Sequence, residues 1–162
     1  MDLAGIVWKT TDAGRSWISR AVCGEPIHAI HYFDSANIVC VGGDFDFGAG
    51  AIFTTDAGEH WSYKYLAIWG EAKSLSFRTE NEGWATLGFS GTIMYTRDKG
   101  RNWTDIYSPD TTSMFDVQFT DVRNGFMVGG EGTILKFNKD LLGVEENKIG
   151  RASCRERVYV LV

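Results

Sequence analysis

The sequence predicts an all-β protein, and three observations support this class. A segment of the form Thr-Xaa-Asp-Xaa-Gly-Xaa-Xaa-Trp occurs three times. Short segments rich in Val, Ile, Thr, Phe and Tyr alternate with Gly, Asn and Asp, and the 162 residues include 19 Gly but only 2 Pro. β-Branched and aromatic residues are typical of strands, and the small residues are typical of turns. No window has the i, i+3, i+4, i+7 apolar spacing of an amphipathic helix.

The repeated segment sets a period in the low forties. Its copies read TTDAGRSW, TTDAGEHW and TRDKGRNW, with aspartates Asp12, Asp56 and Asp98 that lie 44 and 42 residues apart. Asp140 follows a further 42 residues on, without the Gly and the Trp. A period of this length with four strand-like segments is typical of propeller blades. We therefore expect a partial β-propeller of about three four-stranded antiparallel blades plus half a blade.

The same order of elements recurs in each period. The first alternating segment is followed by a polar turn and a second strand, a third strand then runs into the repeated segment, and a fourth strand begins at its Trp. The first half-blade contains only the third and fourth of these strands. We expect a propeller fragment over residues 1–140, with repeats near 4–20, 27–66, 72–107 and 113–138.

The repeated segment itself has the residues of a tight hairpin turn. An Asp can accept hydrogen bonds from backbone N–H groups two or three residues on, the Thr hydroxyl serves the same turn, and Gly adopts a positive φ without strain. The Trp can bury a large ring between neighbouring sheets. We interpret these residues as structural rather than catalytic: Thr10, Asp12, Gly14, Trp17, Thr54, Asp56, Gly58, Trp61, Thr96, Asp98, Gly100 and Trp103.

At these residues the chain resembles the Asp-box (bacterial neuraminidase repeat) superfamily, which includes sialidases, sortilin-type receptors and photosystem II stability and assembly factors. The longer pattern, at residues 77–103 and 119–133, is more similar to the assembly-factor-like and sortilin-like repeat proteins than to the sialidases. The resemblance covers residues 5–140. It implies a propeller whose boxes lie on the outer rim.

A sialidase would need an arginine triad, a Tyr–Glu nucleophile pair and an acidic general acid. The arginines before the C-terminal tail are scattered through box hairpins and turns, and the nearby carboxyls Glu80 and Glu82 are better read as solvated turn residues. We expect no catalytic residues. The six arginines concerned are Arg15, Arg20, Arg78, Arg97, Arg101 and Arg123.

The sequence offers no cofactor or metal site. His28 and His31, three residues apart on one strand, would point to opposite faces, and His60 is the only other histidine. A zinc site needs about four ligands of this kind. The segment Gly129–Gly132 leads into a strand, so it lacks the strand-then-helix setting of a phosphate loop.

The three cysteines predict no disulfide framework. A hairpin turn near residues 35–36 would place Cys40 opposite Tyr32 and leave Cys23 beyond reach. We expect two small buried or half-buried thiols. Cys154 lies in the C-terminal tail.

Charge and hydropathy argue against a nucleic-acid-binding protein and against a transmembrane helix. The formal net charge of −5 and the scattered Lys and Arg argue against nucleic-acid binding. No run approaches the roughly 20 apolar residues of a transmembrane helix, and the first residues carry no signal peptide.

The C-terminal residues depart from the repeat. Residues 141–148, with the sequence LLGVEENK, resemble the linker before a C-terminal sorting domain in proteins exported by the type IX pathway. Residues 149–158 resemble a translated sequencing adapter, so we expect 149–162 to be a non-native tail in which Cys154, Arg155 and Arg157 have no function.

We expect a non-enzymatic propeller module of an exported bacterial protein, at the cell surface or outside the cell, that binds a protein or a glycan. Further expected partners are the missing blades of the same propeller, because three blades leave open sheet edges. The alternatives are a fragment of a sialidase-like glycoside hydrolase and a photosystem II assembly-factor-like protein.

Overall fold

The computed structural model describes residues 5–108, 111–138 and 157–161 and confirms the all-β prediction. The described residues contain no α-helix, and the short 3₁₀ turn η2 (Gly130–Gly132) precedes the last strand of the repeat. The strands are β1 (Gly5–Lys9), β2 (Ile18–Cys23), β3 (Ile27–Tyr32), β4 (Ile38–Asp44), β5 (Gly48–Thr54), β6 (Ser62–Tyr65), β7 (Ser74–Phe77), β8 (Gly83–Thr86), β9 (Thr92–Thr96), β10 (Thr104–Tyr107), β11 (Met114–Phe119), β12 (Asn124–Gly129), β13 (Thr133–Asn138) and β14 (Arg157–Leu161).

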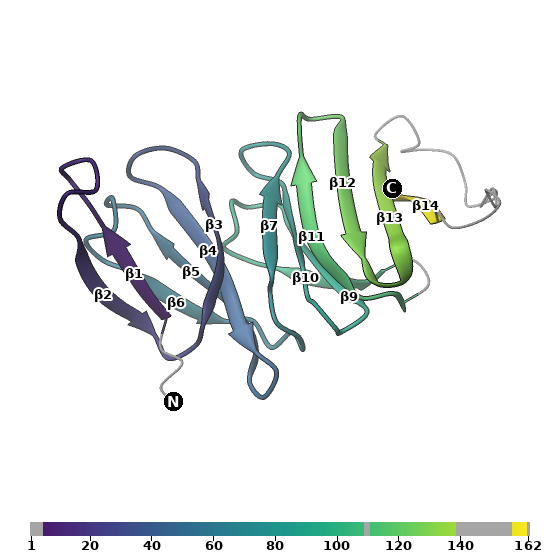
Figure 1. The fold of residues 1–162 in the computed structure, drawn as a ribbon, viewed down its shortest axis with the longest axis horizontal. Coiled ribbons are helices and arrows are strands. Elements are labelled where there is room, and N and C mark those ends of the chain that lie inside the picture. Colours follow the sequence, from purple (N-terminus) through teal and green to yellow (C-terminus); the bar gives the residue numbers. More distant parts are fainter. Residues whose placement is uncertain (1–4, 109–110, 139–156, 162) are drawn as a thin grey trace.

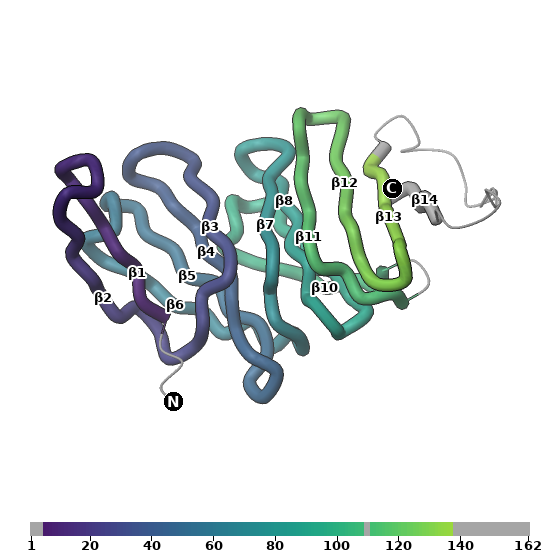
Figure 2. Tube along the Cα trace, in the orientation of Figure 1, coloured from purple at the N-terminus to yellow at the C-terminus, as the bar shows by residue number. Residues whose placement is uncertain are grey.

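The strands form four sheets that follow one another along the long axis of the molecule (Figures 1 and 2). The first sheet has two strands in the order β1-β2, and the others follow the orders β3-β4-β5-β6, β7-β8-β9-β10 and β11-β12-β13-β14. All pairs are antiparallel except β13 with β14. Up-and-down sheets stacked in this way make up part of a β-propeller.

The strand β14 comes from the tail that the sequence places outside the propeller. It lies beside β13 in the position of a fourth strand, but it runs parallel, whereas β6 and β10 run antiparallel to their neighbours. An open strand edge offers unpaired N–H and C=O groups to any extended segment, and the run Val158–Val162 is apolar. Residues 139–156, which include Asp140, the linker and Cys154, lie outside the described residues.

Side-chain polar groups close the hairpins between the first and second strands. Asp34 Oδ1 accepts hydrogen bonds from the backbone N–H groups of Ala36 and Asn37 at 2.8 and 2.9 Å. Asp121 holds the corresponding turn of the fourth sheet in the same way, with bonds of 2.7 and 2.9 Å. These Asx-type turns fix the register of the strands that follow.

The register places Cys40 opposite Ile30, so the expected pairing with Tyr32 is wrong. The turn occupies residues 33–37 and is longer than the expected turn centred on residues 35–36, so the pairing of β3 with β4 is shifted. Cys23 packs from the neighbouring sheet against the buried cluster that contains Cys40. Both thiols are free.

The core lies between the sheets rather than within one of them. One cluster joins the third and fourth sheets through Trp84, Ile93, Met114 and Val117, among others. A second cluster joins the second and third sheets, where Val41 packs with residues such as Met94. Burying one large apolar side chain contributes roughly 1.5–3 kcal/mol, so each sheet depends for its stability on the sheets beside it.

Equivalent positions in successive sheets therefore differ in exposure. The third strand of each sheet carries an apolar residue that faces the preceding sheet. Ile52, Met94 and Leu135 occupy this position with exposures of 1, 0 and 0%. Trp8 occupies it in the first sheet and is 59% exposed. No described sheet precedes β1–β2, so this face is open.

The opposite end of the stack is open as well. The second strand of each sheet carries an apolar residue that faces the following sheet: Val39 is 1% exposed and Trp84 is 8% exposed, but Phe126 is 43% exposed. Two residues further along, Val41 is fully buried and Val128 is 44% exposed. The described sheets thus have two unfilled faces, one at each end.

Candidate functional site

The first Asp box forms a closed network of hydrogen bonds. The Thr10 hydroxyl donates to Asp12 Oδ1 at 2.9 Å and accepts from the Gly14 N–H at 2.9 Å. Asp12 Oδ1 accepts from the Ser16 N–H at 2.9 Å, and the Trp17 indole N–H donates to the Gly14 carbonyl at 3.1 Å. Each of the four box residues therefore has a partner inside its own turn.

The second and third boxes repeat this network. The threonine hydroxyl donates to the aspartate at 2.8 and 2.9 Å, and the glycine N–H donates to the threonine at 3.0 and 3.1 Å. The indole N–H donates to the glycine carbonyl at 3.1 and 2.9 Å. The residues involved are Thr54, Asp56, Gly58 and Trp61 in the second box, and Thr96, Asp98, Gly100 and Trp103 in the third.

Hydrogen bonds hold the pKa values of the box aspartates low. The Ser16 hydroxyl and N–H bring the pKa of Asp12 down to about 2. The N–H and ring of His60 lower the pKa of Asp56. At Asp98 burial raises the pKa, but the Asn102 side chain and backbone outweigh it and the net shift is downward. Carboxylates that stay ionised in this way cannot act as general acids near neutral pH.

Two details of the box differ from the sequence expectation. The aspartate accepts from the N–H four residues on, rather than two or three, because the residue before the glycine also adopts a positive φ: 58° at Ala13, 59° at Ala57 and 61° at Lys99. The Trp17 ring is 54% exposed, whereas Trp61 and Trp103 pack against the apolar clusters between sheets, as expected.

The arginines lie at the Asp-box end of the sheets or reach towards it. Arg78 bonds to Glu82 and to the Val122 carbonyl of the next sheet, and its guanidinium lies 5.1 Å from the Phe137 ring centroid. Arg20 binds the Glu59 carbonyl in the box of the neighbouring sheet. Box hairpins and adjacent turns carry the others: Arg15, Arg97, Arg101 and Arg123.

The histidines are not brought together. The His28 ring lies 3.1 Å from the Gly43 carbonyl, while His31 stacks against Phe77 with centroids 4.5 Å apart. Burial lowers the pKa of His31, and His60 is paired with Asp56 at 2.7 Å. Among the described residues no three His, Cys, Asp or Glu side chains form a group that could hold a metal ion.

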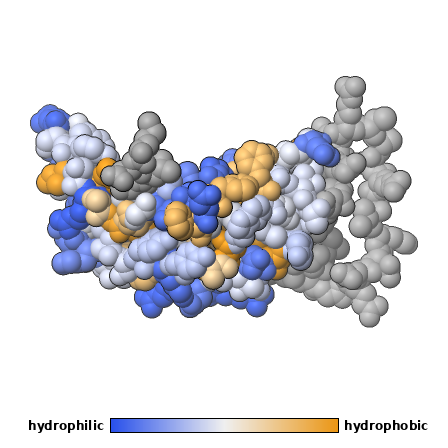
Figure 3. Space-filling view, turned by 90° about the horizontal axis from the view of Figure 1, so that it is seen from below, coloured by the Kyte–Doolittle hydropathy of each residue, from blue (hydrophilic) through white to orange (hydrophobic). Residues whose placement is uncertain are grey.

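The end of the sheets opposite the Asp boxes exposes a group of aromatic side chains. We call Phe45, Phe47, Trp69, Phe89 and Phe115 the aromatic loop surface. Phe47 is 63% exposed, Phe89 is 65% exposed and Trp69 is 56% exposed. Figure 3 views the molecule from this end and shows apolar side chains between the polar ones. Exposed aromatic groups of this kind are typical of binding surfaces.

Ring contacts and loop hydrogen bonds hold this surface in place. Phe45 packs edge-to-face against Trp69, with centroids 4.9 Å apart, and Phe89 packs against Phe115 at 5.1 Å. Asp44 Oδ1 accepts from the Phe47 N–H at 2.7 Å and so fixes the loop between β4 and β5. The rings are therefore ordered before any partner arrives, which lowers the entropic cost of binding.

The backbone ties the loops of three sheets together beneath the rings. The Ala49 N–H donates to the Ile68 carbonyl at 2.8 Å, and this bond connects the β4–β5 loop to the segment before β7. The Gly88 N–H donates to the Met114 carbonyl at 3.0 Å and links the third sheet to the fourth. One surface is thus built from residues that are up to 70 positions apart, from Phe45 to Phe115.

A pair of carboxyls lies at the same end. Burial raises the pKa of Glu25, and the Asp44 carboxylate raises it further by its charge and by hydrogen bonding to the protonated form. Glu71 in this region pairs with Lys73 at 2.5 Å.

The sequence reading missed the aromatic loop surface because it treated the connecting segments as turns. A signal was present in FDFG at residues 45–48, where two Phe side chains occupy a loop in which polar residues are usual. The segment Gly129–Gly132, by contrast, forms a turn that leads into β13, as expected. None of the described residues forms a helix that is long and apolar enough to cross a membrane.

Comparison with known proteins connects these repeats to a family. Residues 70–138 match the family model described as photosynthesis system II assembly factor YCF48. The chloroplastic photosystem II stability/assembly factor HCF136 of Arabidopsis thaliana is 32% identical over 65 residues, which are 39% of this chain and 16% of that protein. The photosystem II assembly lipoprotein Ycf48 of Synechocystis is 34% identical over 93 residues, which are 53% of this chain and 27% of that protein.

Two solved structures show the same fold. YCF48 bound to a D1 peptide has a TM-score of 0.56 and 23% identity, over 68% of this chain and 36% of that one. The NanB sialidase of Streptococcus pneumoniae has a TM-score of 0.55 and 13% identity, over 74% of this chain and 23% of that one. The chain thus spans well under half of the length of each of these proteins.

The repeats of this chain are thus similar to those of the photosystem II assembly factors and share the fold of other Asp-box propellers, which confirms the resemblance seen in the sequence.

Proposed function

We propose that the chain is a non-enzymatic propeller module that binds a protein segment through the aromatic loop surface. The observation that carries this proposal is the aromatic loop surface, in which Phe45, Phe47, Trp69 and Phe89 are exposed and the pairs Phe45–Trp69 and Phe89–Phe115 are in ring contact. Rigid aromatic rings supply large apolar contact areas, and they dominate the energetics of protein interfaces.

A protein partner is favoured over a glycan by the comparisons and by the chemistry of the surface. The related YCF48 was solved bound to a D1 peptide, so a propeller of this fold can hold a peptide. The aromatic loop surface consists of five aromatic rings, with the exposed Asp46 between Phe45 and Phe47. Aromatic side chains are enriched among the residues that dominate binding at protein–protein interfaces, so this surface is suited to a protein partner.

An assembly-factor-like role is the second candidate, because both sequence relatives and the family match at residues 70–138 bear that name. The sialidase-like alternative has support at the level of fold only. The box hairpins and turns carry most of the arginines of the described residues, at the end away from the aromatic loop surface and the Glu25–Asp44 pair.

We also propose that the parent protein is exported. The relative from Synechocystis is a lipoprotein, and residues 141–148 resemble the linker of exported proteins. The twelve Asp-box residues have a structural role in this proposal: they close the hairpins at the end away from the partner. The blade ranges 4–20, 27–66, 72–107 and 113–138 belong to the same proposal, as does the assignment of 149–162 to a non-native tail.

Selection of peptides on the full chain tests the binding proposal. A random peptide display library is panned on the wild type, and the selected peptides are measured against the double variant Phe47→Ser, Phe89→Ser. We expect the double variant to lose at least tenfold in affinity. Tyr107→Ser is the matched control, because Tyr107 is 79% exposed on β10 and lies outside the surface.

Four outcomes discriminate between the candidates. Peptides that need Phe47 and Phe89 but tolerate Tyr107→Ser support the proposal. Peptides that bind the double variant as tightly as the wild type refute it. A D1 peptide that binds the wild type, with the same dependence on Phe89, favours the assembly-factor-like role, and release of sialic acid from 3′-sialyllactose would establish the enzyme alternative.

A further inference from the structure

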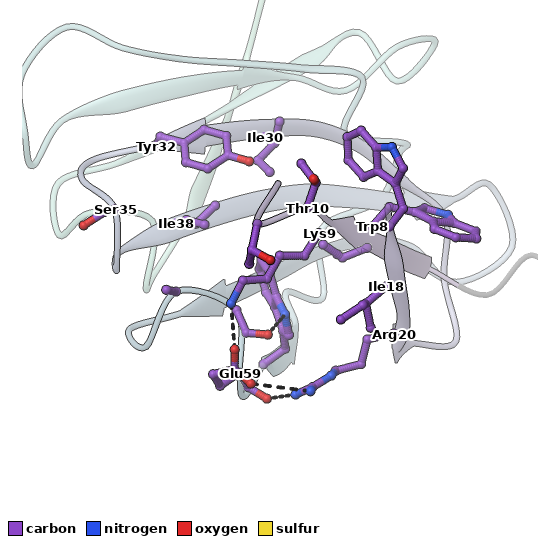
Figure 4. A pocket seen from close by; sticks show the side chains of 16 residues that line it. Trp8, Lys9, Thr10, Ile18, Arg20, Ile30, Tyr32, Ser35, Ile38 and Glu59 are labelled. Atoms are coloured by element: carbon purple, nitrogen blue, oxygen red, sulfur yellow. Dashed lines mark hydrogen bonds and ion pairs between the residues drawn. The ribbon is translucent and has the colours of Figure 1, made fainter. Parts of the chain in front are cut away.

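An open groove separates the first sheet from the second. It has a volume of about 430 Å³, and Val7 is among its lining residues. Ile18 lies on the side of the first sheet, and Ile30, Tyr32 and Ile38 lie on the side of the second (Figure 4). Its apolar lining is exposed, with Ile18 at 67%, Ile30 at 45% and Tyr32 at 62%. Apolar grooves of this kind mark places where another surface packs.

The later sheets show what fills the equivalent space. Val117 and Phe119 on β11 stand where Ile30 and Tyr32 stand on β3. Val117 is 4% exposed, because it packs in one cluster with Trp84 from β8 of the preceding sheet. Phe119 also contacts Trp84, with ring centroids 5.0 Å apart. The second strand of the preceding sheet therefore covers this face.

The first sheet has counterparts of the two outer strands only. β1 and β2 correspond to β5 and β6, because each pair flanks an Asp box. β5 pairs with β4 on one edge and with β6 on the other, whereas β1 pairs with β2 alone among the described residues. One edge of β1 thus offers backbone N–H and C=O groups beside an apolar groove.

Ion pairs connect the two sheets at the Asp-box end of the groove. Lys9 Nζ lies 2.6 Å from Glu59 Oε1, and Arg20 Nη2 lies 3.6 Å from Glu59 Oε2 (Figure 4). Lys64 makes the equivalent contact one sheet further on, where its Nζ donates to the Arg101 carbonyl at 3.1 Å. The first two sheets are therefore joined at this end by the same kind of contact as the second and third sheets, whose inner strands are present.

We propose that this groove binds a two-stranded β-hairpin of the repeat's own inner-strand type. The second strand of the hairpin pairs antiparallel with β1, as β4 pairs with β5. Its alternate side chains pack on Ile30 and Tyr32, as Trp84 packs on Val117 and Phe119. Strand addition to an open edge is a general mode of peptide recognition, in which the backbone supplies affinity and the side-chain pockets supply specificity.

The chain contains a probe for this site. A synthetic peptide of residues 72–87, AKSLSFRTENEGWATL, comprises β7, β8 and their turn. Its N-terminus is labelled with fluorescein and its anisotropy is measured against the full 162-residue chain. We expect saturable binding, and we expect hydrogen exchange to slow at the amides of β1 that do not bond to β2.

Matched substitutions assign the binding to the groove. Ile30→Asp in the protein and Trp84→Ser in the peptide should each weaken binding at least tenfold. Phe126→Asp, at the open face of the other end, should change it less than twofold. Ile30 and Phe126 are 45% and 43% exposed, so both protein variants are expected to fold, which circular dichroism checks.

The proposal is overturned if the peptide does not bind, if Ile30→Asp has no effect, or if Phe126→Asp abolishes binding instead. Sedimentation tests the choice of occupant. A dimer of the wild type without peptide that Ile30→Asp converts to a monomer would show that a second copy fills the groove, and the hairpin would then be rejected as its occupant.

Discussion

The glycine of the Asp box allows one substitution to be made in three different surroundings. Gly14, Gly58 and Gly100 have φ angles of 87°, 83° and 80°, so alanine meets the same backbone strain at each position. The atoms around the new Cβ differ. At Gly14 the nearest atom is Trp17 Cζ2 at 3.6 Å, whereas at Gly100 it is Val39 Cγ2 of the neighbouring sheet at 2.9 Å.

The expected costs follow from these distances. A left-handed conformation costs an alanine about 1–2 kcal/mol. Gly14→Ala should therefore destabilise the protein by about 1–2 kcal/mol, and Gly58→Ala by a similar amount, since only its own Trp61 lies near, at 3.3 Å. Overpacking adds about 1–3 kcal/mol in a close-packed interior. Gly100→Ala should thus cost about 2–5 kcal/mol, because Val39 is 1% exposed and has little room to move.

Urea unfolding followed by far-ultraviolet circular dichroism measures the three free energies at 25 °C. Native-state hydrogen exchange separates the sheets, because stacked repeats do not always unfold as one unit. A further double variant, Gly100→Ala with Val39→Ala, should recover part of the loss. Equal destabilisation at Gly14 and Gly100 would refute the idea that the third box packs against the neighbouring sheet.

Three further predictions concern exposure and ionisation. Met94→Ala should cost about 2–5 kcal/mol because its side chain is fully buried, and Trp8→Ala, at the equivalent position but 59% exposed, should cost less in the same urea assay. The pKa of Asp12 is held at about 2, below its usual 3.8, so the stability it contributes should be complete above pH 4 and lost as the pH falls towards 2; a carboxyl titration by NMR with a midpoint near 4 would contradict this. Burial raises the pKa of Cys40 to about 12, so iodoacetamide should label half-buried Cys23 before Cys40 in the native protein and both equally in urea.

The strands and their order could be predicted from the sequence because the Asp box fixes where one hairpin of each period lies. Its Thr, Asp and Gly act on one another within five residues, so no tertiary information is needed to place them. Registers depend on more than this. Cys40 lies opposite Ile30 because the Asp34 carboxylate closes a longer turn, and that turn could not be read from residue types alone.

The environment of equivalent residues could not be predicted. Ile30, Leu75 and Val117 are similar in the sequence, but Ile30 is 45% exposed and Val117 is 4% exposed. The difference arises from the sheet that packs in front of each strand. A repeat pattern in the sequence does not say whether such a neighbouring sheet is present. The proximity of Cys23 to the cluster around Cys40 is a contact between sheets of the same kind.

The two ends of the sheets differ in the same way between residues that recur with the period and residues that do not. Residues that recur with the period, such as Asp12 and Asp98, form their hydrogen bonds inside their own turns. Few of their polar atoms are therefore left to bind a ligand. Phe47 and Trp69 belong to loops that differ from sheet to sheet, and their rings remain exposed. Periodicity identifies the residues that every blade needs in order to fold, so a binding surface has to be sought where one blade departs from the others. In this chain those departures converge on the aromatic loop surface, at the end that the Asp boxes do not occupy.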